Sequence, residues 1–155
     1  MTASDPAAVE APDNEQAEAS SGYRLQEQVG FLLRKAQQRH VAIFGAHIGD
    51  LTPPQFAALA KLGDVGETSQ NQLGVMVTMD AATIKGVVDR LKSRGLVDIS
   101  KDDGDRRRVM VALTAEGRAT LESLLPAARE ITRETLAPLS AKDARQLVKL
   151  LGRIS

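Results

Sequence analysis

Between residues 81 and 113 the spacing of the apolar residues changes from a helical repeat to the alternation of a strand. In residues 81–94 the aliphatic side chains fall at i, i+3, i+4 and i+7, as Ile84, Val87, Val88 and Leu91. In residues 97–101 and 109–113 they occupy every second position. The first spacing indicates a helix with one buried face and the second indicates half-buried strands. The chain therefore has a helix that leads directly into a β-hairpin.

A second, shorter helix precedes this one. Ser69 and Gln72 have the spacing of a capping box at its start, and Leu73, Met76 and Val77 supply its apolar positions. A break at residues 78–80 separates it from the helix at 81–94, which Gly95 ends. Two short helices joined by so short a turn form a helix-turn-helix unit, and the hairpin at residues 97–113 is then its wing.

Longer helices flank this unit. The spacing of the apolar residues predicts one helix over residues 23–49. Thr52, Pro53 and Gln55 supply the cap, first position and capping box of the next helix, which Gly63 and Gly66 end. After the wing, Thr114 caps a long helix in which Pro126 predicts a kink, and Ser140 caps a last helix.

These elements give a mainly α fold with a small β-hairpin. We assign residues 51–114 to a winged helix-turn-helix lobe that binds DNA, and residues 23–50 and 115–155 to dimerisation helices. Residues 1–22 are rich in Ala, Ser, Glu and Pro and lack a core, so we expect a disordered acidic tail.

Composition narrows the class of protein. The 155 residues include no cysteine, which excludes disulfides and thiolate chemistry, and they include only two histidines. No apolar run approaches the ~20 residues that span a bilayer, and the start of the chain lacks the pattern of a signal peptide. We therefore expect a cytoplasmic protein that does not bind membranes.

The formal net charge of zero conceals an uneven distribution. Residues 1–22 contain five acidic and no basic residues, so the remaining chain has 20 basic against 15 acidic residues and carries about +5. This balance permits binding to a polyanion.

The outward face of the helix at residues 81–94 is the first candidate surface for DNA. Its first half is small and polar, as entry into the major groove requires, and its cations can reach bases or phosphates. An ordinary surface helix of mixed charge is the competing interpretation. The candidate DNA-binding residues are Ala82, Thr83, Lys85, Gly86, Asp89 and Arg90, together with Asn71 in the preceding helix.

The wing is the second candidate surface. Arg106, Arg107 and Arg108 follow an acidic turn, and guanidinium groups suit phosphate contacts and a narrow minor groove. We expect Asp105 to pair with and orient a neighbouring arginine, which leaves another free to reach DNA. A solvated turn whose charges balance locally would also explain the run.

A ligand site is suggested by the first long helix. His40, Phe44 and His47 share one side with Arg39 adjacent, and Phe56 could close a pocket that binds an aromatic carboxylate or phenolate. Half-buried histidines at an interface are the competing interpretation. The basic residues around Arg34 suit phosphates, so an acyl-CoA thioester is a further possible ligand, although a solvated helix face explains them as well.

The sequence offers no constellation of an enzyme. A Gly-rich phosphate loop and a cysteine nucleophile are absent, and scattered carboxylates lie at helix starts, where capping explains them. We therefore predict no catalytic residue, no cofactor and no metal site.

Three segments together resemble the MarR (multiple-antibiotic-resistance regulator) family. They are the run from Asp80 to Val97, the Asp-Gly-Asp-Arg-Arg wing at 103–107, and Leu-Thr-Ala-Glu-Gly at 113–117. The resemblance extends over residues 24–155 and implies a homodimer on a palindromic operator, often a repressor released by a small aromatic or phenolic anion. It also implies a DNA-binding role for the matching residues, which are Thr83, Asp89, Arg90, Asp105, Arg106 and Arg107.

Three positions depart from the family pattern. Ala82 stands where serine is common, Gly86 where a longer side chain is common, and Ile99 where arginine is usual. These departures shift base readout toward Lys85. The zero net charge, Gly86 and the acidic wing tip keep open a second function, a winged-helix module for protein interaction that has little affinity for DNA.

Overall fold

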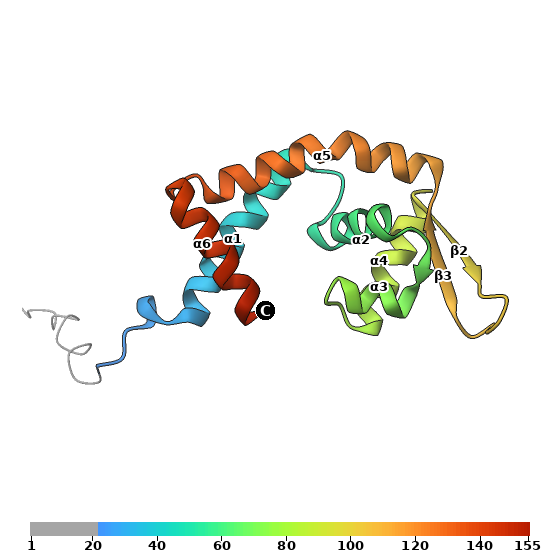
Figure 1. Ribbon diagram of the computed structural model, residues 1–155, viewed down its shortest axis with the longest axis horizontal. Coiled ribbons are helices and arrows are strands. Elements are labelled where there is room, and N and C mark those ends of the chain that lie inside the picture. The colour runs from blue at the N-terminus through green and yellow to red at the C-terminus, as the bar shows by residue number, and fades with distance from the viewer. Residues whose placement is uncertain (1–21) are drawn as a thin grey trace, which may run out of the picture. The chain divides into compact units, whose positions relative to one another are not determined.

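A computed structural model describes residues 22–155, so the tail predicted for residues 1–22 lies, apart from Gly22, outside the described part. The chain divides into two compact units, one up to Gln37 and the other Gln38–Ser155. Figure 1 labels the elements, which are α1 (Val29–His47), α2 (Pro53–Val65), β1 (Thr68–Ser69), α3 (Gln70–Met76), α4 (Ala81–Ser93), β2 (Val97–Lys101), β3 (Val109–Leu113), α5 (Ala115–Leu136) and α6 (Ala141–Ile154).

The helix predicted over residues 23–49 is shorter than expected. A 3₁₀ turn at Leu25–Glu27 comes first, and Gln28 has an extended backbone with φ −79° and ψ 132°. This residue interrupts the helical hydrogen bonding, so α1 begins only at Val29. The apolar spacing continues across the interruption and therefore gives no sign of it.

The other helix boundaries largely follow the predicted caps. Thr52 and Gln55 form a complete capping box, and the side chains of Ser69, Asp80, Thr114 and Ser140 each accept a backbone N–H three residues on. Gly63 does not end α2, which continues to Val65; the terminating residue is Gly66, with φ +78°. Gly95, with φ +72°, ends α4 as predicted. α5 continues through Pro126 to Leu136.

The sheet has three antiparallel strands rather than two. Its order is β1-β3-β2, with Thr68 opposite Val111 and Ile99 on the other side of the same residue. The two strands predicted at 97–101 and 109–113 have the predicted bounds. β1 was missed because two residues are too few to show an alternation, and they directly precede α3, with Ser69 serving as its cap.

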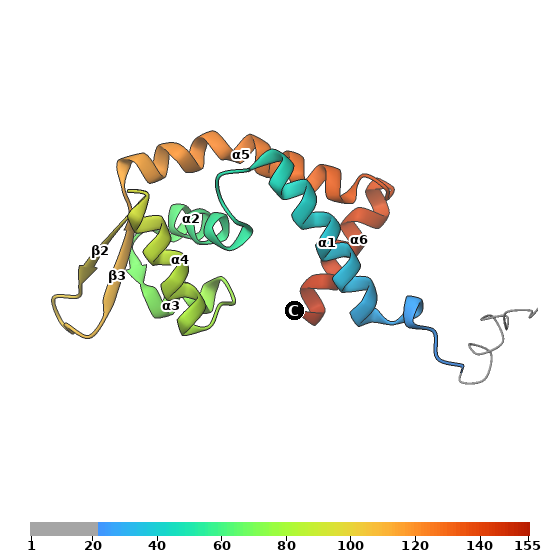
Figure 2. The ribbon, with the colours of Figure 1, turned by 180° about the vertical axis from the view of Figure 1, so that it is seen from behind.

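The core of the second unit joins α2, α3 and α4 to this sheet. The contacts run between α3 and α4, α2 and α4, α4 and β2, and α2 and α5. Figures 1 and 2 show the three short helices together beside the strands, with the loop between β2 and β3 extending beyond them. The largest fully buried side chains are Leu59, Leu62, Leu73, Ile84, Leu91, Val88, Val97 and Val111.

Gly117 fixes the start of α5 against Leu96, which lies between α4 and β2. A Cβ atom at this position would lie 1.9 Å from the carbonyl oxygen of Leu96. The same carbonyl accepts the backbone N–H of Thr114 at 3.2 Å. Only glycine permits this approach, which sets where the long helix leaves the winged lobe.

Within residues 22–155, no helix is both long enough and apolar enough to cross a membrane.

Candidate nucleic-acid interface

α4 presents the predicted arc to solvent. Its buried residues are Ile84, Val87, Val88 and Leu91, the four that the helical spacing indicated. The intervening positions are all exposed, namely Ala82, Thr83, Lys85, Gly86, Asp89 and Arg90. The core therefore orients this helix so that its polar residues can meet a partner.

Two of these residues are paired with each other. The Lys85 Nζ lies 2.6 Å from the Asp89 Oδ2, one helical turn along. Among the described residues no ion pair involves Arg90, so its guanidinium is available for a phosphate or a base. Gly86 lies between Lys85 and Asp89 in the sequence. A methyl group added at Gly86 would meet nothing within 4 Å beyond the backbone of its own helix. Packing within the chain therefore does not require glycine at this position.

The turn before α4 is held by local contacts. The Asp80 carboxylate accepts the backbone N–H of Thr83 at 2.7 Å. This hydrogen bond, with a further one from the Thr83 side chain, lowers the pKa of Asp80 below its ordinary value of 3.8. Thr78 has φ +56°, a left-handed conformation that is unusual for a β-branched residue. The Asp80 cap and the close packing of Gly74 against Ile84 hold this turn in place.

The wing has an internal ion pair, but not the predicted one. The Arg108 guanidinium lies 3.2 Å from the Asp102 carboxylate. Lys101 pairs with Val109 in the ladder, so continuing the register places Asp102 opposite Arg108. The expectation that Asp105 pairs with an arginine side chain is wrong: its Oδ1 accepts the backbone N–H of Arg107 at 3.0 Å, because an Asp at this position of a turn bonds to the backbone two residues on.

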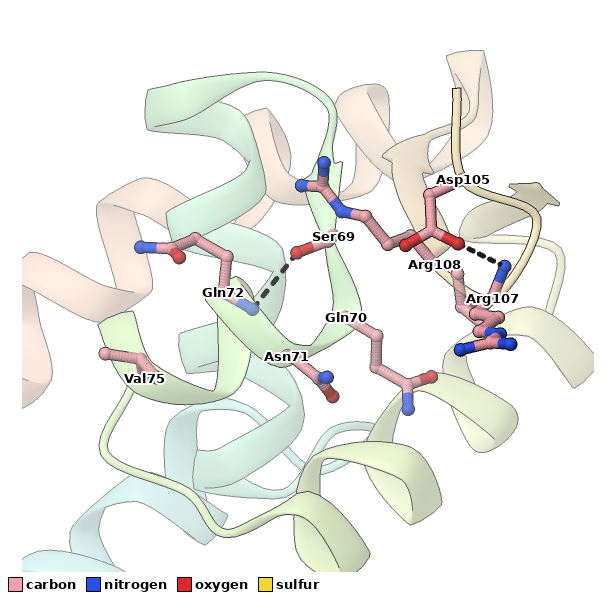
Figure 3. A pocket seen from close by; sticks show the side chains of 9 residues that line it. Ser69, Gln70, Asn71, Gln72, Val75, Asp105, Arg107 and Arg108 are labelled. Atoms are coloured by element: carbon pink, nitrogen blue, oxygen red, sulfur yellow. Dashed lines mark hydrogen bonds between the residues drawn. The ribbon is translucent and has the colours of Figure 1, made fainter. Parts of the chain in front are cut away.

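The wing and α3 together line a groove of about 490 Å³. Figure 3 shows Gln70 and Asn71 from the start of α3, with Arg107 and Arg108 from the wing. Asn71, Arg106 and Arg107 are exposed. Among the described residues no ion pair involves Arg106 or Arg107. The groove therefore combines hydrogen-bonding amides and cationic side chains with the Asp105 carboxylate. Amides and cations are groups that contact a nucleic-acid backbone.

The candidate ligand residues of α1 are engaged with the end of α5. Arg39 donates to the carbonyl oxygens of Thr135 at 2.6 Å and Glu134 at 3.0 Å. Both carbonyls belong to the last turn of α5, and the Glu134 carbonyl also accepts the backbone N–H of Ala137 at 3.2 Å. The His40 Nδ1 lies 3.0 Å from the Thr135 Oγ1, and the His47 Nε2 lies 2.7 Å from the Glu134 Oε2.

The two candidate aromatic residues are in contact. The rings of Phe44 and Phe56 pack edge to face with centroids 6.0 Å apart, and Phe44 is buried. Arg34 belongs to the other unit, where its guanidinium lies 5.5 Å from the centre of the Phe31 ring. Thus Arg39, His40 and His47 contact the end of α5, Phe44 contacts Phe56 of α2, and Arg34 lies in the first unit.

Residues 22–155 contain no group of three or more metal-ligating side chains that could hold an ion.

Sequence reasoning missed Asp102, Glu134 and Thr135. Asp102 could have been found by extending the strand register one step past Lys101. No sequence signal points to Glu134 and Thr135, since they lie more than 85 residues from the α1 side chains that they contact.

The family model described as "MarR family" matches residues 51–109. The HTH-type transcriptional repressor NicR of Pseudomonas putida is 46% identical over 134 residues, which cover 85% of each chain. This long match extends well beyond the winged lobe.

Solved structures show the same similarity. A probable transcriptional regulator from Pseudomonas aeruginosa is 54% identical with a TM-score of 0.82, over 85% of this chain and all of that one. Bordetella bronchiseptica BpsR, solved to explain how 6-hydroxynicotinic acid regulates its DNA binding, is 43% identical with a TM-score of 0.83, over 86% of this chain and 97% of that one. With a helix-turn-helix, a wing and relatives of this similarity, the chain belongs to the MarR family of transcriptional regulators.

Proposed function

We propose that this chain is a repressor that binds a palindromic operator as a homodimer and leaves it when a small aromatic acid binds. The observation that carries the proposal is the shared exposure of the α4 arc and the wing arginines within one packed lobe. A regulator of this kind works on the chromosome, so we place its action in the cytoplasm.

The DNA contacts divide by chemistry. On α4, the exposed side chains of Thr83, Lys85 and Arg90 would contact base edges or phosphates, and Ala82 and Gly86 would allow a close approach in the major groove. On the wing, Arg106 and Arg107 would contact phosphate or a narrow minor groove, with Arg108 and Asn71 in the adjoining groove.

Dimerisation is supported by apolar surface that the chain leaves uncovered. α6 has no buried residue, although its aliphatic side chains recur at helical spacing; Ile154 is 70% exposed. In the first unit Val29 is 66% exposed, with Leu32 and Leu33 also exposed. Large apolar faces of this kind are covered in stable proteins by a partner, and a second copy is the simplest one.

The effector class is supported by BpsR, whose DNA binding is regulated by 6-hydroxynicotinic acid. We propose a hydroxylated aromatic carboxylic acid of this kind. The imidazoles of His40 and His47 and the guanidinium of Arg39 can bind a carboxylate or phenolate, and the Phe44 and Phe56 rings can contact an aromatic ring. A CoA thioester of such an acid, which would use Arg34 for its phosphates, is the second candidate.

The DNA part is tested with the full chain and duplexes enriched by it from a randomised pool. We expect enrichment of an inverted repeat, retention of duplex DNA at low salt and a steep fall in affinity as salt rises. Sedimentation should give a dimer at micromolar concentration. If the chain neither enriches a sequence nor binds random duplex at low salt, the interaction-module function becomes the better account.

The effector part is tested by thermal shift with 6-hydroxynicotinic acid, other hydroxylated aromatic acids and their CoA thioesters. A ligand that binds the folded state raises the melting temperature in a concentration-dependent way. Binders are then added to the complex with the enriched duplex. Release by the free acid supports the proposed class, release by the thioester alone selects the second candidate, and tighter DNA binding contradicts the repressor-release scheme.

A further inference from the structure

The ion pair between Lys85 and Asp89 lies on the part of α4 that the proposed function directs toward DNA. The two charged atoms are 2.6 Å apart, while the side chains are 65% and 51% exposed. Both partners come from α4 itself, so the pair joins no other element to the helix.

Helix stability does not explain this pair. A lysine that precedes its acidic partner by four residues has the less favourable order, because the reverse order suits the helix dipole. Aspartate is also a poor residue for a helix interior, and exposed pairs contribute little to stability. A neutral residue at position 89 would serve the helix at least as well.

The pair changes the charge that α4 offers to DNA. The Asp89 carboxylate neutralises Lys85 and places a negative charge on the exposed face beside Arg90. The Lys85 ammonium has three N–H donors, so it can bind a phosphate while it keeps Asp89, but the carboxylate is then brought close to the DNA backbone. Its negative charge offsets the attraction of Lys85 for DNA of any sequence.

One suitably placed base pair can form hydrogen bonds with both Lys85 and Asp89. In the major groove guanine offers two acceptors to a lysine, and the N4 amino group of cytosine is a donor that an aspartate accepts. A correctly placed G·C pair thus gives partners to Lys85 and to Asp89 together. Random sequence gives them no such combination.

We propose that Asp89 is a specificity-determining residue, which lowers affinity for random DNA by holding Lys85 and favours operators that place G·C base pairs beneath the Lys85–Asp89 pair. The inference rests on the proposed function, since it requires that α4 meets DNA.

The test uses the full-length dimer as wild type, Asp89→Asn, Lys85→Gln and the double variant. Affinities for a random duplex and for the duplex enriched by the wild type are measured from about 50 to 200 mM salt. Asp89→Asn should strengthen random binding by roughly tenfold at the lowest salt and steepen the salt dependence by about one unit. Its ratio of enriched to random affinity should fall by a similar factor.

Lys85→Gln should remove most of this gain, because the freed lysine is its source. Glu122→Gln is the control: it removes the same charge from an exposed position on α5, outside the α4 arc and the wing, where no ion pair with Glu122 exists among the described residues. Equal gains from Glu122→Gln and Asp89→Asn, or an Asp89→Asn effect that Lys85→Gln does not change, would show an effect of net charge alone and overturn the proposal.

The measurements on the wild type and on Asp89→Asn separate the proposed DNA-binding function from the role of Asp89. A wild type that binds neither duplex at low salt overturns the proposed function and this inference together. A wild type that binds and discriminates, but whose specificity ratio is unchanged in Asp89→Asn, overturns only the role of Asp89.

Discussion

Asp102 and Arg108 face each other across the base of the wing turn, with the guanidinium 3.2 Å from the carboxylate. The Asp102 backbone N–H also donates to the Arg108 carbonyl at 3.2 Å, so the hairpin register continues one residue pair past the strands. The three consecutive arginines of the wing therefore differ in whether an ion pair within the hairpin holds them. Arg108 is held within the hairpin, whereas Arg106 and Arg107 extend from its exposed turn.

This inequality predicts how the wing arginines contribute to DNA binding. Arg106→Ala or Arg107→Ala should weaken binding on the order of tenfold at low salt and lower the salt slope by about one for a phosphate contact. If the residue enters a narrow minor groove, the loss should be concentrated on A·T-rich sites. The melting temperature should stay nearly constant, since neither side chain packs on the core. Fluorescence anisotropy with labelled duplexes measures the affinities.

The control for lost charge is Arg118→Ala, an exposed arginine at the start of α5. Operator affinity that is unchanged in both wing variants, or reduced equally by Arg118→Ala, would remove the wing from the mechanism. Asp105→Ala should weaken binding in the same direction as the wing variants, because Asp105 holds the Arg107 backbone N–H.

The sequence predicted the elements that local rules determine. The strand bounds at 97–101 and 109–113, the caps at Thr52, Ser69 and Thr114, and the exposed arc of α4 each follow from spacing or side-chain chemistry within a few residues. The interruption at Gln28 escaped because the apolar spacing runs through it.

The contacts that escaped prediction are those between distant segments. Asp102 pairs with Arg108 because the cross-strand register places the two residues opposite each other. The α1 histidines contact Thr135 and Glu134 at the end of α5. By residue type alone, either Asp102 or Asp105 could form an ion pair with a wing arginine. Only the cross-strand register distinguishes the two. Likewise Gly117 stands out in the sequence as part of a motif, while its physical reason, the Leu96 carbonyl, appears only in the fold.

Gly117 gives a prediction about stability. Gly117→Ala should destabilise the protein by about 3 kcal/mol or more, because the added methyl would overlap the Leu96 carbonyl and the backbone cannot move without disturbing the α5 cap. Urea unfolding at fixed protein concentration measures the change.

Gly86→Ala is the matched helix-interior control. Its added methyl would meet nothing within 4 Å beyond the helix's own backbone, so the variant should be more stable by about 0.5–1 kcal/mol through helix propensity. Similar behaviour of the two variants would contradict the close approach at Gly117. A loss of operator affinity in the stabilised Gly86→Ala variant would in addition support close contact of α4 with DNA.

Asp80 gives a prediction about pH. Its pKa is lowered in the folded state mainly by the Thr83 backbone hydrogen bond, so near its ordinary value of 3.8 the unfolded chain binds more protons than the folded one. The stabilisation from this cap is therefore complete well above that value and is lost as pH falls through the folded pKa. Asn also caps helices and does not titrate in this range. Asp80→Asn should thus show a smaller drop in melting temperature between about pH 6 and pH 3 than the wild type does. An identical drop in both proteins would mean that this cap does not titrate with folding.

Arg39 decides between two interpretations of the α1 cluster. Its two hydrogen bonds to the Thr135 and Glu134 carbonyls close the end of α5, and a lysine cannot reproduce this forked geometry. If the role is structural, Arg39→Lys should lower the free energy of unfolding by up to about 1 kcal/mol, since the group is exposed and water competes for it. Lys35→Ala, a change in the same helix at a residue without an ion pair in the described part, should have almost no effect on unfolding.

If Arg39 instead binds the effector carboxylate, Arg39→Lys should leave unfolding nearly unchanged and weaken the thermal shift by 6-hydroxynicotinic acid. Measuring both quantities on the same dimer at one protein concentration separates the two roles, because the helix-end contact affects the unliganded protein and a ligand contact does not.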